Sequence, residues 1–168
     1  MNLQQYRPLI LFGTLLGLLW VTKEQTVKPL ATVVSKYLGT RGLRNNNPGN
    51  IRWDGRTQWA GMIGQDANGF VIFDTPQNGI RAIVRTLRSY ANRHIDTIGE
   101  IISTWAPSSE NNTGAYIDHV VSIVGKNSGA EITPDDYLKL VGAIIAHENF
   151  VNPYPDDVLN AGIAAGLA

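Results

Sequence analysis

The residue best placed for acid catalysis lies near the end of the last long helix that the sequence predicts. Apolar residues with helical spacing form one stripe along this helix: Tyr137, Val141, Ile144 and Ile145. Glu148 follows three residues later on the same stripe. Burial removes water from a carboxylate and a helix C-terminus adds negative potential, so both effects favour the protonated form of Glu148. A protonated glutamic acid can act as general acid in glycosidic cleavage; the alternative is a glutamate at a fraying helix end that turns back to water.

A second candidate catalytic acid, Glu110, falls in a polar loop between two expected helices. The neighbouring Asn111 and Asn112 carry amide groups that could bind hydroxyl groups of a ligand. The alternative for Glu110 is a solvated loop acid, or a residue that supports a helix cap at Thr113. Three aspartates flank the expected strands and could assist a sugar-cleaving acid, although aspartate is also common in turns for local reasons: Asp54, Asp66 and Asp74.

Other catalytic chemistries lack the residues that they need. The chain has no cysteine, which excludes disulfides, thiolate metal sites and a cysteine nucleophile. His147-Glu148 resembles the zinc-protease helix motif, but Val151 occupies the position of its second histidine. The other histidines, His94 and His119, lie on separate segments, and neither a Gly-x-Ser-x-Gly elbow nor a phosphate-binding loop occurs. We therefore expect no metal and no cofactor.

The charge balance gives no reason to expect nucleic acid as the main partner. Lysine plus arginine equals aspartate plus glutamate, 14 against 14. Hydrophobic residues make up 43% of the 168 residues, which is typical of a globular chain. One expected helix carries a row of basic residues, Arg81, Arg85 and Arg88. We interpret this row as a solvent-exposed helix face; the alternative is contact with DNA phosphates during packaging.

An apolar segment without charges, residues 8–22, lies close to the N-terminus. A bilayer core needs about 20 helical residues, so this segment spans a membrane only if the residues before it lie in the interface. Tyr6 and Trp20 would then sit at the two headgroup levels. We predict a membrane-anchoring helix in residues 1–24 and a connector in residues 25–40; the alternatives are a cleaved signal sequence and a buried core helix.

Residues 41–168 carry the pattern of one mostly helical domain. Three segments near its start have the character of short strands: residues 51–53, 59–63 and 70–73. Helices follow, and cap residues mark where they begin: Thr75 with Pro76, Thr97 with Glu100, Thr113, and Thr133 with Pro134. The fold class is therefore mainly α (α+β), with a small antiparallel sheet in a helical domain.

The segment Arg41–Arg52, RGLRNNNPGNIR, resembles a family of phage virion structural proteins. Further motifs of that family look similar in the same order, within residues 69–82, 105–116 and 143–154. The resemblance covers residues 41 to about 165. It implies a place in a phage particle and contacts with other virion proteins.

A second resemblance concerns the helix that carries Glu148. The segment Ala143–Phe150, AIIAHENF, is similar to the helix of lytic transglycosylases that ends at their catalytic glutamate, although that helix comes first in those enzymes. Residues 114–120, GAYIDHV, look like their tyrosine-containing helix. The likeness implies a lysozyme-like, circularly permuted domain in which Glu148 is catalytic. It also implies residues that bind or support the sugar: Asn46, Asn50, Tyr116 and Glu110.

These features together predict a virion-associated, membrane-anchored enzyme that cleaves peptidoglycan in the bacterial periplasm during phage entry or exit. Lytic transglycosylases need one carboxylate and ordinary glycosidases use two, and the sequence offers no firm second acid beside Glu148. The alternative is a phage structural protein without activity, which keeps a lysozyme-like fold for assembly or for binding peptidoglycan.

Overall fold

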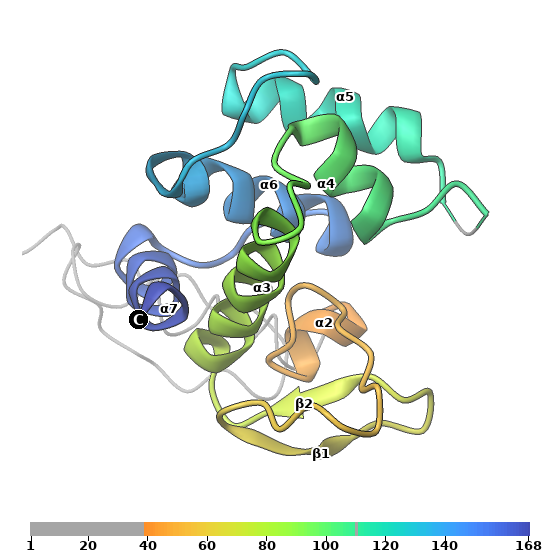
Figure 1. Ribbon diagram of the computed structural model, residues 1–168. Coiled ribbons are helices and arrows are strands. Elements are labelled where there is room, and N and C mark those ends of the chain that lie inside the picture. The colour runs from red at the N-terminus through yellow and green to blue at the C-terminus, as the bar shows by residue number, and fades with distance from the viewer. Residues whose placement is uncertain (1–38, 110) are drawn as a thin grey trace, which may run out of the picture.

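The computed structural model describes residues 39–109 and 111–168 and arranges them as a mainly helical fold with a small sheet (Figure 1). The longer helices are α3 (Pro76–Ala91), α4 (Ile98–Trp105), α5 (Thr113–Val124), α6 (Tyr137–Asn149) and α7 (Asp156–Leu167). Shorter elements are the helix α2 (Arg41–Arg44), the 3-10 turn η1 (Pro134–Asp136), and the strands β1 (Met62–Gln65) and β2 (Val71–Phe73). The predicted mainly α class with a small antiparallel sheet is confirmed.

The predicted membrane helix falls outside the described residues. Residues 1–24, with their apolar segment 8–22, and nearly all of the predicted connector 25–40 belong to the part of the chain that the structure does not describe. Within residues 39–109 and 111–168, no helix combines the length and the apolar character needed to cross a bilayer. The anchor therefore remains a prediction from sequence.

The sheet is a hairpin closed by a turn that the sequence predicts. Strand β1 pairs with β2 in antiparallel register, with Gly64 opposite Ile72. In the turn between them, Asp66 Oδ1 accepts hydrogen bonds from the backbone N–H groups of Asn68 and Phe70 at 2.9 and 3.0 Å. The aspartate is thus used locally, as turn aspartates commonly are.

Two of the three predicted strands differ in length from what the sequence predicts. The strand expected at residues 59–63 begins only at Met62, because Gly61 has a left-handed φ of 71° and the chain turns between Trp59 and Met62. Residues 51–53 form a single bridge between Arg52 and Phe70 in place of a strand. In the asparagine-rich loop, residues 45–50, the side chain of Asn47 bonds to the N–H of Ile51 and to the carbonyl of Val71, so ladder pairing does not extend.

The helix starts follow local capping chemistry. Thr75 caps α3 with Pro76 at its first position, and Thr97 forms a capping box with Glu100 at the start of α4, as predicted. The predicted cap at Thr113 was wrong: Asn112 caps α5, because the hydroxyl of Thr113 donates to the carbonyl of Ala106 at 2.7 Å.

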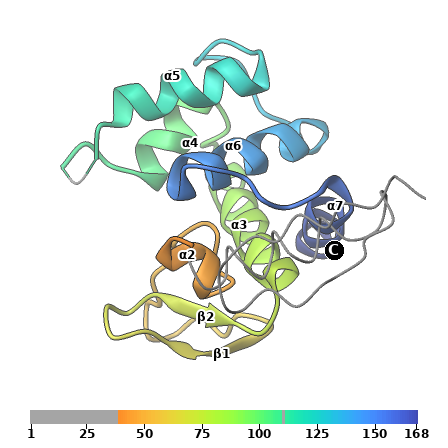
Figure 2. The same ribbon diagram turned by 180° about the vertical axis from the view of Figure 1, so that it is seen from behind.

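Helix α3 passes through the middle of the fold, between the sheet with α2 on one side and helices α4, α5 and α6 on the other (Figures 1 and 2). Helix α7 lies beside α3, and glycines allow the two backbones to approach. A Cβ atom at Gly162 would lie 2.6 Å from Ile80 Cβ, and one at Gly166 would lie 2.5 Å from Val84 Cβ. The C-terminal helix therefore packs only because these two positions carry no side chain.

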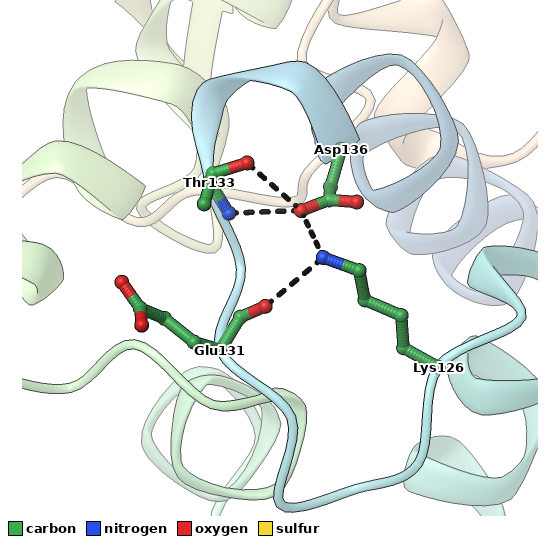
Figure 3. A network of polar contacts seen from close by, with 4 residues as sticks. All are labelled: Lys126, Glu131, Thr133 and Asp136. Atoms are coloured by element: carbon green, nitrogen blue, oxygen red, sulfur yellow. Dashed lines mark hydrogen bonds and ion pairs between the residues drawn. The ribbon is translucent and has the colours of Figure 1, made fainter.

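A small polar network joins the end of α5 to the start of α6 (Figure 3). Asp136 Oδ2 accepts hydrogen bonds from Lys126 Nζ at 2.6 Å and from the N–H and hydroxyl of Thr133 at 2.9 and 3.1 Å. The Lys126 ammonium group also donates to the carbonyl of Glu131 at 3.1 Å. The hydrogen bond from Lys126 and then the backbone N–H of Thr133 lower the pKa of Asp136. The network thus fixes the loop in front of α6, whose far end carries Glu148.

We expect Asp136→Ala to lower the free energy of unfolding by about 1–2 kcal/mol, most of it from the lost cap and the rest from the half-exposed ion pair. Asp135→Ala is the matched control, because Asp135 is exposed and makes no side-chain hydrogen bond to the described residues. Urea unfolding at neutral pH compares the two variants. Equal loss in both would mean that the network does not stabilise the fold.

Candidate active site

Three hydrogen-bond donors converge on the carboxyl group of Glu148 at the C-terminal end of α6. Trp105 Nε1 and the Tyr116 hydroxyl each lie 3.2 Å from Glu148 Oε1. Asn50 Nδ2 lies 2.9 Å from Oε2. Glu148 is half-buried, so its carboxyl group is held by the protein without being sealed from solvent.

The three donors come from separate elements of the fold. Trp105 is the last residue of α4, and Tyr116 lies in the first turns of α5 with 1% of its surface exposed. Asn50 ends the asparagine-rich loop after α2 and has a left-handed φ of 48°, which asparagine tolerates better than most residues. Packing of α4, α5 and this loop against α6 therefore sets the position of the carboxyl group.

The asparagine-rich loop is fixed to α6 by the residue that follows Glu148. Asn149 is 2% exposed, and its Nδ2 donates to the carbonyls of Pro48 and Ile145 at 2.7 and 3.0 Å. Its Oδ1 accepts from the hydroxyl of Thr40. One side chain thus binds its own helix and the loop that carries Asn50.

A pocket of about 380 Å³ opens beside the carboxyl group. Glu148, Asn50 and Trp105 contribute to its wall. The remaining lining is largely polar or aromatic and includes Arg41, Arg52, Phe70, Tyr90 and Asn111. A mostly polar pocket with one converging acid suits a hydroxyl-rich ligand better than an apolar one.

Sequence comparison shows that the chain is similar to a phage protein. The chain is 41% identical over 131 residues to protein P5 of Pseudoalteromonas phage PM2. The aligned region covers 76% of this chain and 82% of the phage protein. The chain belongs to the P5 family. No family model matches the chain. The resemblance to phage proteins seen in the sequence is thereby confirmed at the level of a phage protein family.

In this P5-family chain, three of the predicted site residues lie together. Asn50 and Tyr116 each donate a hydrogen bond to Glu148, although they lie 98 and 32 positions before it in the sequence. Tyr116 is too buried to touch a ligand, so its place is that of a support for Glu148. Whether these residues act on a substrate stays a prediction.

Other predicted residues lie elsewhere. Asn46 is not part of the pocket wall, because its Nδ2 donates to the carbonyls of Phe73 and Asp74 at 3.0 and 3.2 Å and so holds the end of β2. The second candidate acid, Glu110, lies outside the described residues. The three aspartates that flank the strands do not line the pocket and accept hydrogen bonds from residues up to four positions away, and Asp66 also accepts one from Asn45: Asp54, Asp66 and Asp74.

Sequence reasoning missed the contact of Trp105 with Glu148. A partly buried indole N–H normally finds an acceptor, which is the signal that could have linked Trp105 to an acidic residue. The arginines of the pocket, Arg41 and Arg52, were also missed as site residues. They lie in the segment on which the phage resemblance rests, but nothing local indicates that they line the same pocket as Glu148.

The ring of His147 stacks on the ring of Tyr116, with centroids 3.5 Å apart and an interplanar angle of 9°. Its Nδ1 lies 3.0 Å from Nδ1 of His119, so one of the two nitrogens carries the proton. Burial raises the pKa of Tyr116, and the adjacent Glu148 raises it further, so the phenol keeps its proton and stays a donor. These contacts hold Tyr116 in the orientation that Glu148 requires.

His147 gives the fold a pH dependence of definite sign. Burial, and then the charge of His119, lower the pKa of His147 below its usual 6.5, while Glu148 acts weakly in the opposite direction. The unfolded chain therefore binds a proton more tightly than the folded chain, and stability that is present above about pH 6.5 falls as the pH drops.

We expect His147→Gln to reduce this loss of stability on acidification. Urea midpoints at pH 7.5 and 5.5 measure the effect, and His94→Asn serves as control because His94 is exposed. A wild-type pH dependence in the His147 variant would contradict this assignment.

Proposed function

We propose that this P5-family protein is a lytic transglycosylase that cleaves peptidoglycan with Glu148 as its catalytic acid and base. The observation that supports this most is the carboxyl group of Glu148, oriented by three donors at the wall of a polar pocket. An oriented carboxyl group beside a space for substrate is the minimum that general acid catalysis of glycoside cleavage needs.

In the proposed reaction, Glu148 first gives its proton to the oxygen that bridges N-acetylmuramic acid and N-acetylglucosamine. The bond between that oxygen and the anomeric carbon of the muramic residue breaks, and the glucosamine chain leaves with the proton. The carboxylate then takes the proton of the muramic 6-hydroxyl, whose oxygen bonds to the anomeric carbon. The products are a 1,6-anhydro end and a free sugar end, and Glu148 regains its proton.

The composition of the pocket supports this route over hydrolysis. Among the described residues that line the pocket, Glu148 is the only carboxylate. Hydrolysis by either common route uses two carboxyl groups, whereas an intramolecular hydroxyl nucleophile requires one. Trp105, Tyr116 and Asn50 keep the carboxyl group oriented through both proton transfers, because each donates to one of its oxygens.

The phage relative supports a virion location, and the apolar segment 8–22 supports a membrane anchor. In this proposal the anchor holds the domain in the particle or delivers it to the host envelope, where it acts on peptidoglycan in the periplasm. Contacts with other virion proteins belong to the same proposal.

The test is incubation of the full chain, purified in mild detergent, with purified peptidoglycan, followed by mass analysis of the released muropeptides. Anhydro-muropeptides support the proposed reaction. Products one water heavier would point to hydrolysis. Intact glycan strands that retain bound protein would favour the alternative, a structural protein that grips peptidoglycan without cleaving it.

A further inference from the structure

The wall of the pocket carries two arginines that form no ion pair with the described part of the protein. The guanidinium carbons of Arg41 and Arg52 lie 3.4 and 4.2 Å from the centre of the Phe70 ring. All three side chains line the same pocket as Glu148. Two cations therefore share one aromatic ring at a solvent-connected site.

Neither arginine forms an ion pair with any residue in the ranges 39–109 and 111–168. The nearby carboxylate of Asp66 accepts hydrogen bonds from Asn45 and from the backbone N–H groups of its own turn, and it is attracted by the charge of Arg41 without forming an ion pair with it. The one carboxylate among the described residues that line the pocket, Glu148, accepts hydrogen bonds from its three donors and forms no ion pair with either arginine. The positive charge of the pair is thus available to a ligand.

The hydrogen bonds of the two guanidinium groups point to the same conclusion. Arg41 Nε is buried without a partner among the described residues. Arg52 uses one nitrogen, Nη1, on the carbonyl of Asn68 at 2.8 Å. A guanidinium group stacked on a ring keeps its in-plane N–H donors free, and this fork fits the two oxygens of a carboxylate. Stacking on Phe70 also restricts the side chains before a ligand arrives, which lowers the entropic cost of binding.

We propose that Arg41 and Arg52 form an anion subsite that binds a carboxylate of the glycan substrate. The proposal rests on the proposed function for the identity of the ligand, whereas the subsite itself follows from the geometry. Peptidoglycan offers such carboxylates in its stem peptides and, where these are removed, in the lactyl group of muramic acid. A neutral sugar polymer offers none. The subsite therefore selects peptidoglycan over uncharged glycans of the same backbone.

Binding is measured on the full chain with Glu148→Gln, so that ligands are not consumed. Three oligosaccharides of equal length are compared: muramic glycan with stem peptides, the same glycan with free lactyl carboxylates, and neutral N-acetylglucosamine oligomer. We expect at least one acidic ligand to bind roughly tenfold more tightly than the neutral one, with an advantage that shrinks as salt rises. The acidic ligand that gains shows which carboxylate occupies the subsite.

Arg52→Gln, added to this background, should remove most of the advantage of the acidic ligand over the neutral oligomer. Arg52 is exposed, so its replacement does not threaten the fold. Arg85→Gln is the matched control, because Arg85 is an exposed arginine of α3 that does not line the pocket. Equal affinity for all three ligands, or equal effects of the two replacements, would overturn the subsite.

The two proposals can fail separately. Cleavage by the wild-type chain without discrimination between acidic and neutral ligands would overturn the subsite and leave the transglycosylase in place. Binding of acidic ligands that depends on Arg52, in a wild-type chain that releases no muropeptides, would establish the subsite and reject the enzyme.

Discussion

Replacing Glu148 with glutamine is expected to reduce release of anhydro-muropeptides by about a thousandfold or more, because glutamine has no proton to give to the bridging oxygen. The side chains have nearly the same shape, so the pocket and its ligand contacts remain. The carbonyl oxygen of the new glutamine can accept from Trp105 and Tyr116, as Glu148 Oε1 does. Its amide group would meet Asn50 Nδ2, and a flip of the Asn50 amide turns its oxygen towards that group.

The flip gives a partner to Asn50 Oδ1, which in the wild-type chain is buried without one among the described residues. Tyr116→Phe is the companion variant: it keeps the acid and removes one donor, and we expect a loss of roughly tenfold. Initial rates of muropeptide release and thermal unfolding are measured on the same preparations. Activity of Glu148→Gln within tenfold of wild type would exclude Glu148 as the catalytic acid.

Local chemistry explains why much of the fold could be predicted from the sequence. The start of α3 at Thr75 and the capping box of α4 depend only on residues close together in the sequence. Gly125 ends α5 in a left-handed conformation, which glycine adopts readily. The misplaced cap at Thr113 shows the limit of such reasoning. Its hydroxyl has a partner seven residues away, at Ala106, and a long-range competitor of this kind is invisible in a local pattern.

The site could be predicted only in part, because its contacts join distant segments. The helical stripe placed Glu148 correctly at the end of α6. The resemblance to transglycosylases singled out Tyr116 as a residue that binds or supports the sugar, and its contact with Glu148 comes from the structure. The roles of the individual asparagines in the loop could not be predicted from the sequence, because their side chains have the same chemistry and differ only in their partners. Asn46 holds β2, Asn47 is fully buried, and Asn50 reaches Glu148. The tertiary fold alone decides which amide faces the pocket.

Asn47→Ala is expected to lower the free energy of unfolding by about 3 kcal/mol or more, the largest stability effect that we predict. Asn47 is 0% exposed, and its Nδ2 donates to the carbonyls of Ile51 and Val71 at 2.8 and 2.9 Å. Its Oδ1 accepts from the N–H of Ile51 at 2.9 Å. Alanine leaves three backbone groups in the interior without these partners.

Urea unfolding measures the loss, with Asn160→Ala as control because Asn160 is exposed on α7 and should change stability by less than about 0.5 kcal/mol. A domain of this size has a total stability of about 5–15 kcal/mol, so the Asn47 variant should still fold at low temperature. A loss no larger than that of Asn160→Ala would mean that the loop is not held by Asn47.

The same variant separates the support of the loop from the chemistry of the pocket. The backbone N–H of Asn50 donates to the carbonyl of Asn47 at 2.9 Å, so a loop loosened by Asn47→Ala also displaces the amide that contacts Glu148. Asn50→Gly removes that amide directly, keeps the left-handed backbone conformation that glycine adopts readily, and leaves the three hydrogen bonds of Asn47 intact. Below the unfolding transition, both variants should therefore cleave more slowly, while only Asn47→Ala should lose much stability. Full activity in a destabilised Asn47→Ala would show that the carboxyl group is oriented without the loop, by Trp105 and Tyr116 alone.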